Sequence, residues 1–312
     1  KVPAAAVELL KASYLASAEH THDPLEIEIK AQAERLLTAK DNGLRNLKHL
    51  REYPMSRELF AMTNAWDIGG GIVEVAAKGA PEAVAELCHL SLSQIEEMSR
   101  EIKSMSDSGL RVLAAARATH RGKTLPLDHR DYHFQYLGLI GFADPIRKQV
   151  PAAVEECQHA GVRVIMITGD YPGTAQFIAK KIGLFNDRDY ITGAQLKIMN
   201  KAELRNRIKY TDIFARVLPE QKLAIVEALK ANREVVAMTG DGVNDAPALK
   251  AAHIGIAMGE RGTDVARETA DLVLLNDDFS TIVKAIRMGR KIFDNIRKAT
   301  AFVFAIHLPI AG

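Results

Sequence analysis

The chain has 312 residues, 47% of them hydrophobic, which is enough for two domains with a core each. Its 41 basic and 39 acidic residues leave a net charge of +2, and this excludes a chain-wide attraction to nucleic acid or to an acidic partner. Any function that depends on charge must therefore rest on a local group of charged residues. Two isolated cysteines, Cys88 and Cys157, fit a reducing compartment better than a disulfide framework.

The first 135 residues carry a mixed pattern of helices and alternating strands. Helices are predicted at 7–15, 24–37 and 95–106. The alternating runs 60–66 and 72–78 are joined by a glycine-rich connection, which predicts an antiparallel hairpin. Its triple glycine is no phosphate loop, because no Gly-Lys-Ser/Thr follows. We interpret 1–135 as a separate α+β domain.

A His-x-His pair, His20 and His22, precedes the predicted helix at 24–37. Such a pair is a candidate metal-ligand set, but the sequence identifies no third ligand. The structural alternative makes Asp23 the helix N-cap, Pro24 the first helical residue and Glu26 the third. We favour this structural alternative.

From residue 136 onward, short apolar runs alternate with helical patterns. Strands are predicted at 136–142, 162–167, 213–217, 235–238, 254–258 and 272–275. Helices are predicted at 149–160, 174–182, 222–231 and 263–268. This alternation predicts an α/β fold with a doubly wound parallel sheet.

Two of these strands run into the same polar turn. Thr168-Gly169-Asp170 follows one strand and Thr239-Gly240-Asp241 follows another, so both turns should lie at one rim of the sheet. Gly240 and Gly242 flank Asp241, so the backbone there can adopt positive φ and let a ligand approach closely.

The second turn continues into an amide and a further carboxylate, a combination that suits magnesium and phosphate. Asp241 is the best magnesium ligand, because Mg²⁺ prefers one or two hard carboxylates plus water. Asn244, the Thr168 hydroxyl and the Gly169 amide are candidate phosphate donors, and Lys222 is a candidate point charge. Asp245 is either a second metal-shell group or a partner that orients a lysine.

Each of these residues also has an ordinary structural interpretation. Asp and Asn form turns, Thr caps helices, and Lys222 alone resembles a solvated helix residue. Two Thr-Gly-Asp turns together with Asp-Gly-Val-Asn-Asp exceed what turn chemistry requires. The combination therefore predicts a phosphoryl-transfer site.

The run Thr239-Gly-Asp-Gly-Val-Asn-Asp-Ala-Pro-Ala-Leu249 resembles, at every position, the hinge signature of P-type cation-transporting ATPases. Further motifs are similar to that family in the same order. They are Lys78-Gly79-Ala80-Pro81-Glu82, Asp144-Pro145-Ile146-Arg147 with one Pro replaced, and Met166-Ile167-Thr168-Gly169-Asp170. The resemblance extends over nearly the whole chain.

This resemblance implies a nucleotide-binding domain (1–135) inserted in a haloacid-dehalogenase-like phosphorylation domain (136–288), with ATP and Mg²⁺ as cofactors. It implies a stalk and the start of a truncated transmembrane helix at 289–312, a transported cation, and a place on the cytoplasmic face of a membrane. The uncharged stretch from 299 is shorter than the roughly 20 residues that a spanning helix needs. Basic residues precede it, as on the cytoplasmic side of a membrane: Arg287, Arg290, Lys291, Arg297 and Lys298. A buried core helix is the alternative for this stretch.

The resemblance also implies nucleotide contacts. Lys78 would line the adenosine pocket, with Glu26, Arg57 and Arg111 near the nucleotide. Met55 stands where relatives carry a Phe that stacks on the nucleotide, so either the nucleotide contact is weaker or Tyr53 substitutes for the Phe. The alternative, that Tyr53 and Met55 are core residues, is equally consistent with the sequence. From the residues alone, Lys78 would cap a solvated turn and Arg57 would lie on the surface. The motifs assign further contacts to Gly79, Asp144, Arg147, Asp170 and Arg216.

The family's phosphorylated aspartate lies in Asp-Lys-Thr-Gly-Thr, and these 312 residues contain no such run. We therefore expect an incomplete parallel sheet that lacks its nucleophile strand, and a chain that is inactive without the remainder of its polypeptide. Two alternatives remain open: a soluble haloacid-dehalogenase-type phosphatase and a non-catalytic nucleotide-binding module. We expect no nucleic acid among the partners of the chain.

Overall fold

The computed structural model describes residues 3–18, 21, 23–36, 47–56, 58–122, 124–260 and 262–311, with 307–311 described by their backbone only. His20, His22 and Arg57 lie outside the described residues. The chain divides into two compact units, Lys1–Asp144 and Pro145–Gly312. The sequence predicted this division between residues 135 and 136.

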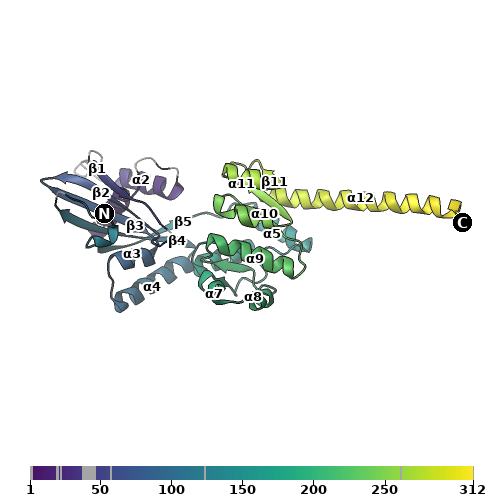
Figure 1. The fold of residues 1–312 in the computed structure, drawn as a ribbon, viewed down its shortest axis with the longest axis horizontal. Helices are drawn as coiled ribbons and strands as arrows, with labels where there is room; N and C mark the ends of the chain where they lie inside the picture. The colour runs from purple at the N-terminus through teal and green to yellow at the C-terminus, as the bar shows by residue number, and fades with distance from the viewer. Residues whose placement is uncertain are drawn as a thin grey trace. The chain divides into compact units, whose positions relative to one another are not determined.

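The first unit is built on one antiparallel sheet with the order β1-β2-β3-β4-β5 (Figure 1). The strands are β1 (Lys48–Tyr53), β2 (Ala61–Gly69), β3 (Ile72–Gly79), β4 (Leu110–Arg121) and β5 (Gln135–Ala143), and a 3₁₀ turn, η2, spans His129–Asp131. The predicted hairpin is confirmed as β2 and β3. Its connection runs through Gly69, Gly70 and Gly71, which all have positive φ and so need glycine.

Helices cover both faces of this sheet. They are α1 (Ala4–Leu15), α2 (Pro24–Leu36), α3 (Pro81–Leu87) and α4 (Leu92–Asp107). Neighbouring residues of β3 point to opposite faces: Ala76 packs against α1, and Ala77 packs into the core beneath α3. Figure 1 shows α2 on one side of the sheet and α3 and α4 on the other.

The strand predicted at 136–142 exists, but its assignment to the parallel pattern is wrong. It is β5, which pairs antiparallel with β4 from Leu110↔Ala143 to Arg117↔Gln135 and belongs to the first unit. An apolar run indicates a buried strand and carries no information about its partner.

The second unit alternates short parallel strands with helices. The strands are β6 (Met166–Ile167), β7 (Ile191–Thr192), β8 (Ile213–Ala215), β9 (Ala237–Gly240), β10 (Ile254–Met258) and β11 (Leu272–Leu274). The helices are α5 (Val150–His159), α6 (Pro172–Ile182), α7 (Gly193–Ile198), α8 (Lys201–Arg207), α9 (Pro219–Ala231), α10 (Ala246–Ala251), α11 (Asp264–Thr269) and α12 (Ser280–Ala311), with a 3₁₀ turn, η3, at Val243–Asp245. The strands form two sheets, β6-β8-β7 and β11-β10-β9.

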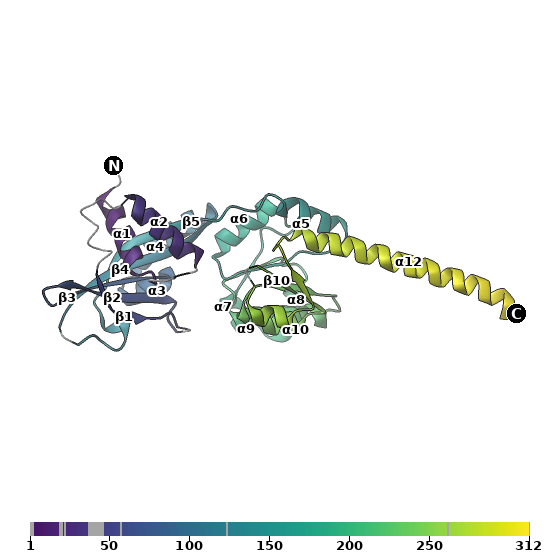
Figure 2. The ribbon, with the colours of Figure 1, turned by 90° about the horizontal axis from the view of Figure 1, so that it is seen from above.

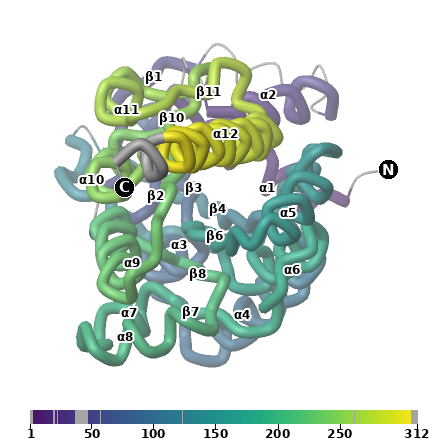
Figure 3. Tube along the Cα trace, turned by 90° about the vertical axis from the view of Figure 1, so that its right-hand side faces the viewer, coloured from purple at the N-terminus to yellow at the C-terminus, as the bar shows by residue number. Residues whose placement is uncertain are grey.

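Helices pack on both faces of β8. Ile213 and Ala215 pack against residues of α5 and α6, while Phe214 packs with α9 on the other face. Figure 3 shows α5 and α6 on one side of β8 and α9 on the other. Met238 of β9 and Ala257 of β10 join the same core as Phe214. The two sheets therefore share one core, and the predicted α/β class, with an antiparallel sheet in the first unit and parallel strands in the second, is confirmed.

The two strands that carry the Thr-Gly-Asp turns lie at the ends of their sheets. Within the described residues, β6 pairs only with β8 and β9 only with β10, so each keeps one free edge. β8 is buried throughout, whereas both residues of β6 are only half-buried. The parallel strands thus do not form one continuous sheet.

The chain's longest helix is α12, which Figure 2 shows as one uninterrupted rod. Ile282 and Val283 are buried against the second unit, and residues 287–306 are exposed. Among the described residues, no helix is both long enough and apolar enough to cross a membrane.

Candidate functional site

The turn after β6 is held by its own hydrogen bonds and by β8. Thr168 Oγ1 donates to Asp170 Oδ2 at 2.9 Å, and the Asp170 amide donates back to Thr168 Oγ1 at 3.0 Å. The Thr168 amide donates to the Phe214 carbonyl, and the Val217 amide donates to the Thr168 carbonyl. A Cβ built at Gly169 would meet no heavy atom within 4 Å, so the turn is open at this residue.

Arg216 lies directly beside this turn. Its amide donates to the Asp170 carbonyl at 3.0 Å, and its Cζ lies 4.7 Å from the centre of the Tyr171 ring. The φ of Arg216 is 53°, a left-handed value that a large side chain rarely adopts. The structure therefore brings together Thr168, Asp170 and Arg216, three of the residues expected at the site. Tyr171, which supports the guanidinium, has no sequence signal of its own.

Asp245 is buried at 5% exposure and its carboxylate is fully engaged. Lys222 Nζ lies 2.6 Å from Oδ1, and the amides of Asp241 and Gly242 donate to Oδ2 at 3.3 and 3.4 Å. The geometry favours the alternative in which Asp245 orients a lysine over a role as metal ligand. Lys222 is correspondingly half-buried and paired with a buried carboxylate, so it is not a solvated helix residue.

Asp241 and Asn244 expose their side chains at the end of β9. Neither side chain makes a hydrogen bond or ion pair within the part of the chain that the structure describes. A single free, hard carboxylate suits Mg²⁺, which keeps several water ligands. No group of three or more His, Cys, Asp or Glu among the described residues is placed to hold a metal. Asp241 therefore fits a hydrated magnesium ion with one or two protein ligands.

Gly240 and Gly242 do not use the positive φ that is open to glycine. Gly242 has a φ of −111°, and Gly240 is not among the glycines with positive φ. Gly240 is needed for a different reason, because a Cβ there would lie 2.5 Å from Asp245 Cβ and 2.8 Å from its Cγ. The glycine makes room for a buried carboxylate rather than for a ligand.

The sequence associated Asp144 and Arg147 with nucleotide. Asp144 is the last residue of the first unit, and Arg147 lies near the start of the second. Arg147 donates to the carbonyl of Asp277 just before α12, and Asp144 is exposed. Asp277 has a φ of 49° and accepts the Glu260 amide at 3.1 Å. Arg147 thus stabilises the entry to α12 in this structure, and no sequence pattern pointed to Asp277 as its partner.

Lys78 is one of the most buried charged residues described, at 6% exposure. Its ammonium donates to the Ala16 carbonyl and to Ser17 Oγ, both at 3.0 Å, and to the Glu26 carboxylate. These three acceptors use the three donors of an ammonium group. The alternative of a solvated turn cap is therefore wrong, and Lys78 with Glu26 forms a preassembled pair between β3 and α2. Asp23 accepts the Leu25 amide at 2.8 Å, as expected of a helix cap.

The two charges of this pair perturb each other's pKa. Burial alone would raise the pKa of Glu26, but hydrogen bonds and charge attraction from Lys78 lower it below its ordinary value. The pKa of Lys78 is also lowered, because the effect of burial exceeds the opposing effect of Glu26.

The remaining expected nucleotide contacts divide into core and surface. Tyr53 is buried, and its hydroxyl donates to the Pro126 carbonyl at 2.7 Å and lies 2.8 Å from the Tyr132 hydroxyl, which favours the core alternative. Met55 is 55% exposed, and Arg111 is exposed at the start of β4. A Cβ at Gly79 would lie 2.2 Å from a backbone oxygen, so the close packing alone requires glycine at this position.

Comparison with known proteins agrees with this architecture. A family model described as haloacid dehalogenase-like hydrolase matches residues 18–253, and a second model with the same description matches residues 221–286. The first match extends over more than half of the chain. The chain therefore belongs to the haloacid dehalogenase-like hydrolase family.

Within that family, the chain is similar to cation-transporting ATPases. It is 38% identical over 310 residues to the sodium/potassium exporting P-type ATPase cta3 of Schizosaccharomyces pombe, covering 93% of this chain and 29% of that protein. It is 40% identical over 302 residues to the cation-transporting ATPase pma1 of Synechocystis, covering 93% and 33%. It is 37% identical over 296 residues to a calcium-transporting ATPase of Bacillus cereus, covering 91% and 33%. The chain thus spans 29–33% of the length of these relatives.

Proposed function

We propose that this chain is the ATP-binding and phosphorylation region of a P-type cation-transporting ATPase. Such an enzyme couples ATP hydrolysis, through an aspartyl phosphate, to cation movement across a membrane. The observation that carries the proposal is the pair of free strand edges, β6 and β9, each ending in a Thr-Gly-Asp turn. The first unit would bind the nucleotide and the second would perform phosphoryl transfer.

The nucleophile would arrive on a strand that this sequence does not contain. A parallel strand inserted between β6 and β9 would end beside both turns, because parallel strands present their carboxyl ends at one rim. An aspartate oxygen there would bond to the γ-phosphorus of ATP as the bond to the ADP oxygen breaks. Water would later release inorganic phosphate and restore the carboxylate.

The chain's own residues would hold the transferring group. Mg²⁺, when bound, neutralises charge on the phosphate oxygens, and Asp241 would hold it. Asn244 and the Gly169 amide would donate to phosphate oxygens, while Asp245 fixes the Lys222 ammonium at the same rim. Thr168 needs to turn its hydroxyl away from Asp170 to donate to phosphate.

In the first unit, Glu26, Lys78 and Arg111 would form the nucleotide site. Lys78 and Arg111 lie on neighbouring strands, β3 and β4, and β4 residue Ala115 pairs with Lys78. Residues 111 and 115 are an even number apart, so Arg111 shares the face on which Lys78 meets Glu26. Because its donors are already used, Lys78 would shape the pocket wall and Arg111 would meet the phosphates.

We further propose that α12 forms a stalk that leads to the membrane, which places both units on the cytoplasmic face. The exposed basic residues Arg287, Arg290 and Lys291 would lie on that side, followed by the uncharged end of the helix. The relatives are named as sodium/potassium exporting, cation-transporting and calcium-transporting ATPases, so what their names share is the movement of a cation.

A labelling experiment tests the phosphoryl-transfer assignment. The chain and a version extended upstream to include an Asp-Lys-Thr-Gly-Thr strand are incubated with γ-labelled ATP and Mg²⁺. We expect acid-stable, hydroxylamine-sensitive label on the extended chain alone. Label on the short chain would show that the nucleophile is already present, and an unlabelled extended chain would contradict the pump assignment.

Matched variants of the extended chain make the test specific. Asp241→Asn should reduce labelling at least a hundredfold, because the magnesium carboxylate is lost. Asp189→Asn removes the same charge from an exposed loop residue and should label normally. Equal labelling of the two variants would exclude Asp241 from the site.

Nucleotide binding is tested separately in the short chain. Arg111→Ala should weaken ATP binding about tenfold and AMP binding less, because Arg111 is assigned to the phosphates. Lys78→Ala should weaken the binding of both ATP and AMP. Circular dichroism must first show that this variant folds. Unchanged ATP affinity in both variants would leave the nucleotide assignment without support.

A further inference from the structure

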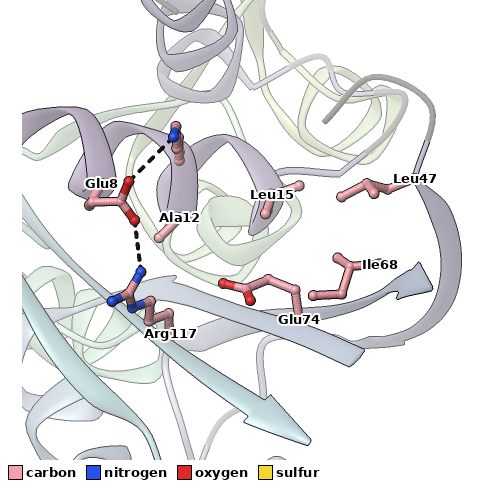
Figure 4. Close-up of a pocket in the computed structure, with 8 residues that line it drawn as sticks. Glu8, Ala12, Leu15, Leu47, Ile68, Glu74 and Arg117 are labelled. Carbon is pink, nitrogen blue, oxygen red and sulfur yellow. Dashed lines mark hydrogen bonds and ion pairs between the residues drawn. The ribbon is translucent and has the colours of Figure 1, made fainter. Parts of the chain in front are cut away.

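The first unit contains a small pocket between α1 and its sheet (Figure 4). Its volume is 150 Å³. Four apolar residues form part of its lining, namely Ala12, Leu15, Leu47 and Ile68, and four charged residues complete it, namely Glu8, Lys11, Glu74 and Arg117. This pocket has no part in the proposed phosphoryl transfer.

Glu74 is the charged residue whose position needs an explanation. Ile72, Glu74, Ala76 and Lys78 alternate on the face of β3 that α1 covers. Ala76 is packed and Lys78 is paired with Glu26, yet the Glu74 side chain makes neither a hydrogen bond nor an ion pair within the described part of the chain. A half-buried carboxylate without a partner is costly to desolvate. Its burial raises the pKa of Glu74, Arg117 opposes that rise and Glu8 adds to it.

The other charges around the pocket are already committed to one another. Glu8 accepts from Arg117 at 2.7 Å and from Lys11 at 3.3 Å. Figure 4 shows these two interactions on one side of the pocket, and Glu74 reaching in without one. Of the two carboxylates and two cations in the lining, Glu74 is therefore the one without an ion pair, and it lies next to an apolar wall. That combination favours a cation over an anion or a neutral polar ligand.

We propose that this pocket binds a small organic cation, a primary ammonium group on a short apolar body. The ammonium would pair with Glu74, and the apolar body would lie against Leu15, Leu47 and Ile68. A volume of about 150 Å³ suits a ligand of a few carbon atoms. A hydrated inorganic cation would leave the apolar wall without a partner.

The chain contains its own reporter for this binding. Trp66, its single tryptophan, pairs with Glu74 across β2 and β3. The Trp66 indole N–H donates to the Leu15 carbonyl at 2.9 Å, and Leu15 lines the pocket. Its indole resonance is therefore a unique NMR signal that is next to both proposed contacts.

The test is a titration of the whole chain with n-butylammonium at constant ionic strength. We expect a saturable shift of the Trp66 indole resonance. n-Butanol, which lacks the charge, and ammonium, which lacks the apolar body, should each bind at least tenfold more weakly. A shift with no saturation, or equal affinity for n-butanol, would overturn the proposal.

Two variants and the pH dependence identify the carboxylate. Glu74→Gln should lose at least tenfold in affinity for n-butylammonium, whereas Glu96→Gln, the same change at an exposed site on α4, should bind like the parent chain. Affinity should also fall as the pH is lowered and Glu74 takes up a proton. Unchanged binding by Glu74→Gln would overturn the assignment. ATP binding and phosphorylation are separate readouts, so failure here leaves the proposed function untouched.

Discussion

At the scale of single residues, Gly240 and Asp245 depend on each other through space. We predict that Gly240→Ala destabilises the second unit by about 1–3 kcal/mol, because the new Cβ would overlap the Asp245 side chain. Gly169→Ala makes the matching change in the other Thr-Gly-Asp turn, where a Cβ meets nothing within 4 Å, and should stay within about 0.5 kcal/mol. Urea unfolding of the two variants measures the difference, and equal losses would contradict the close approach.

The buried pair of Lys78 and Glu26 should make the stability of the first unit depend on pH. The folded pKa of Glu26 is below its ordinary value, so its contribution is present above about pH 4.5 and is lost as the pH falls through the folded pKa. Lys78→Met removes the main partner and leaves a buried carboxylate. We expect a loss of about 3 kcal/mol at pH 7 and a smaller loss near pH 4, where Glu26 takes up a proton.

Urea unfolding at the two pH values checks this expectation. The double variant Lys78→Met/Glu26→Gln should recover part of the stability at pH 7, because no unpaired charge remains buried. An equal loss at both pH values would mean that the pair contributes through packing and not through charge.

At the scale of elements, α12 is buried against the second unit at its start and exposed over residues 287–306. We predict that Val283→Ala costs about 2 kcal/mol, because Val283 is buried against Ala153 and Cys157. Deleting residues 292–312 should change the stability of the second unit by less than about 0.5 kcal/mol, because the side chains described there are exposed. Thermal unfolding of both variants tests the contrast, and a large loss on truncation would show that the distal helix packs on the unit.

The elements that the sequence predicted well are those with strong local signals. The strand at 254–258 is found unchanged as β10, and the helix at 222–231 is the greater part of α9. The long strand β4 was missed because its centre consists of Ala114, Ala115 and Ala116, which lack the β-branched side chains typical of strands. Local periodicity gave β5 the correct type and the wrong sheet, because strand pairing is decided by distant residues.

In the candidate site, too, the features set by local sequence were predictable, whereas most contacts between distant segments were not. The two Thr-Gly-Asp turns were predictable, since each follows its own strand directly. The pairing of Asp245 with a lysine was one of two stated alternatives, and the structure identifies that lysine as Lys222. The partners of Lys78 were not predictable, because Ser17 and Glu26 belong to segments far away in the sequence. Sequence patterns identify groups that suit a chemistry, whereas packing decides which of their donors remain free.

At the scale of the whole molecule, the division into two units predicts where the chain can be cut. The first unit, ending at Asp144, has its own cores on both faces of a complete five-stranded sheet. We expect residues 1–144 to fold alone, and to bind ATP as tightly as the whole chain if the first unit holds the nucleotide site. A fragment that ends at residue 135 removes β5, which pairs along most of β4 and covers part of the same core. It should therefore expose the edge of β4, lose cooperative unfolding and bind ATP at least tenfold more weakly. Circular dichroism melts and ATP titrations of both fragments decide the matter, and a stable 1–135 fragment would place the boundary where the sequence alone had suggested it.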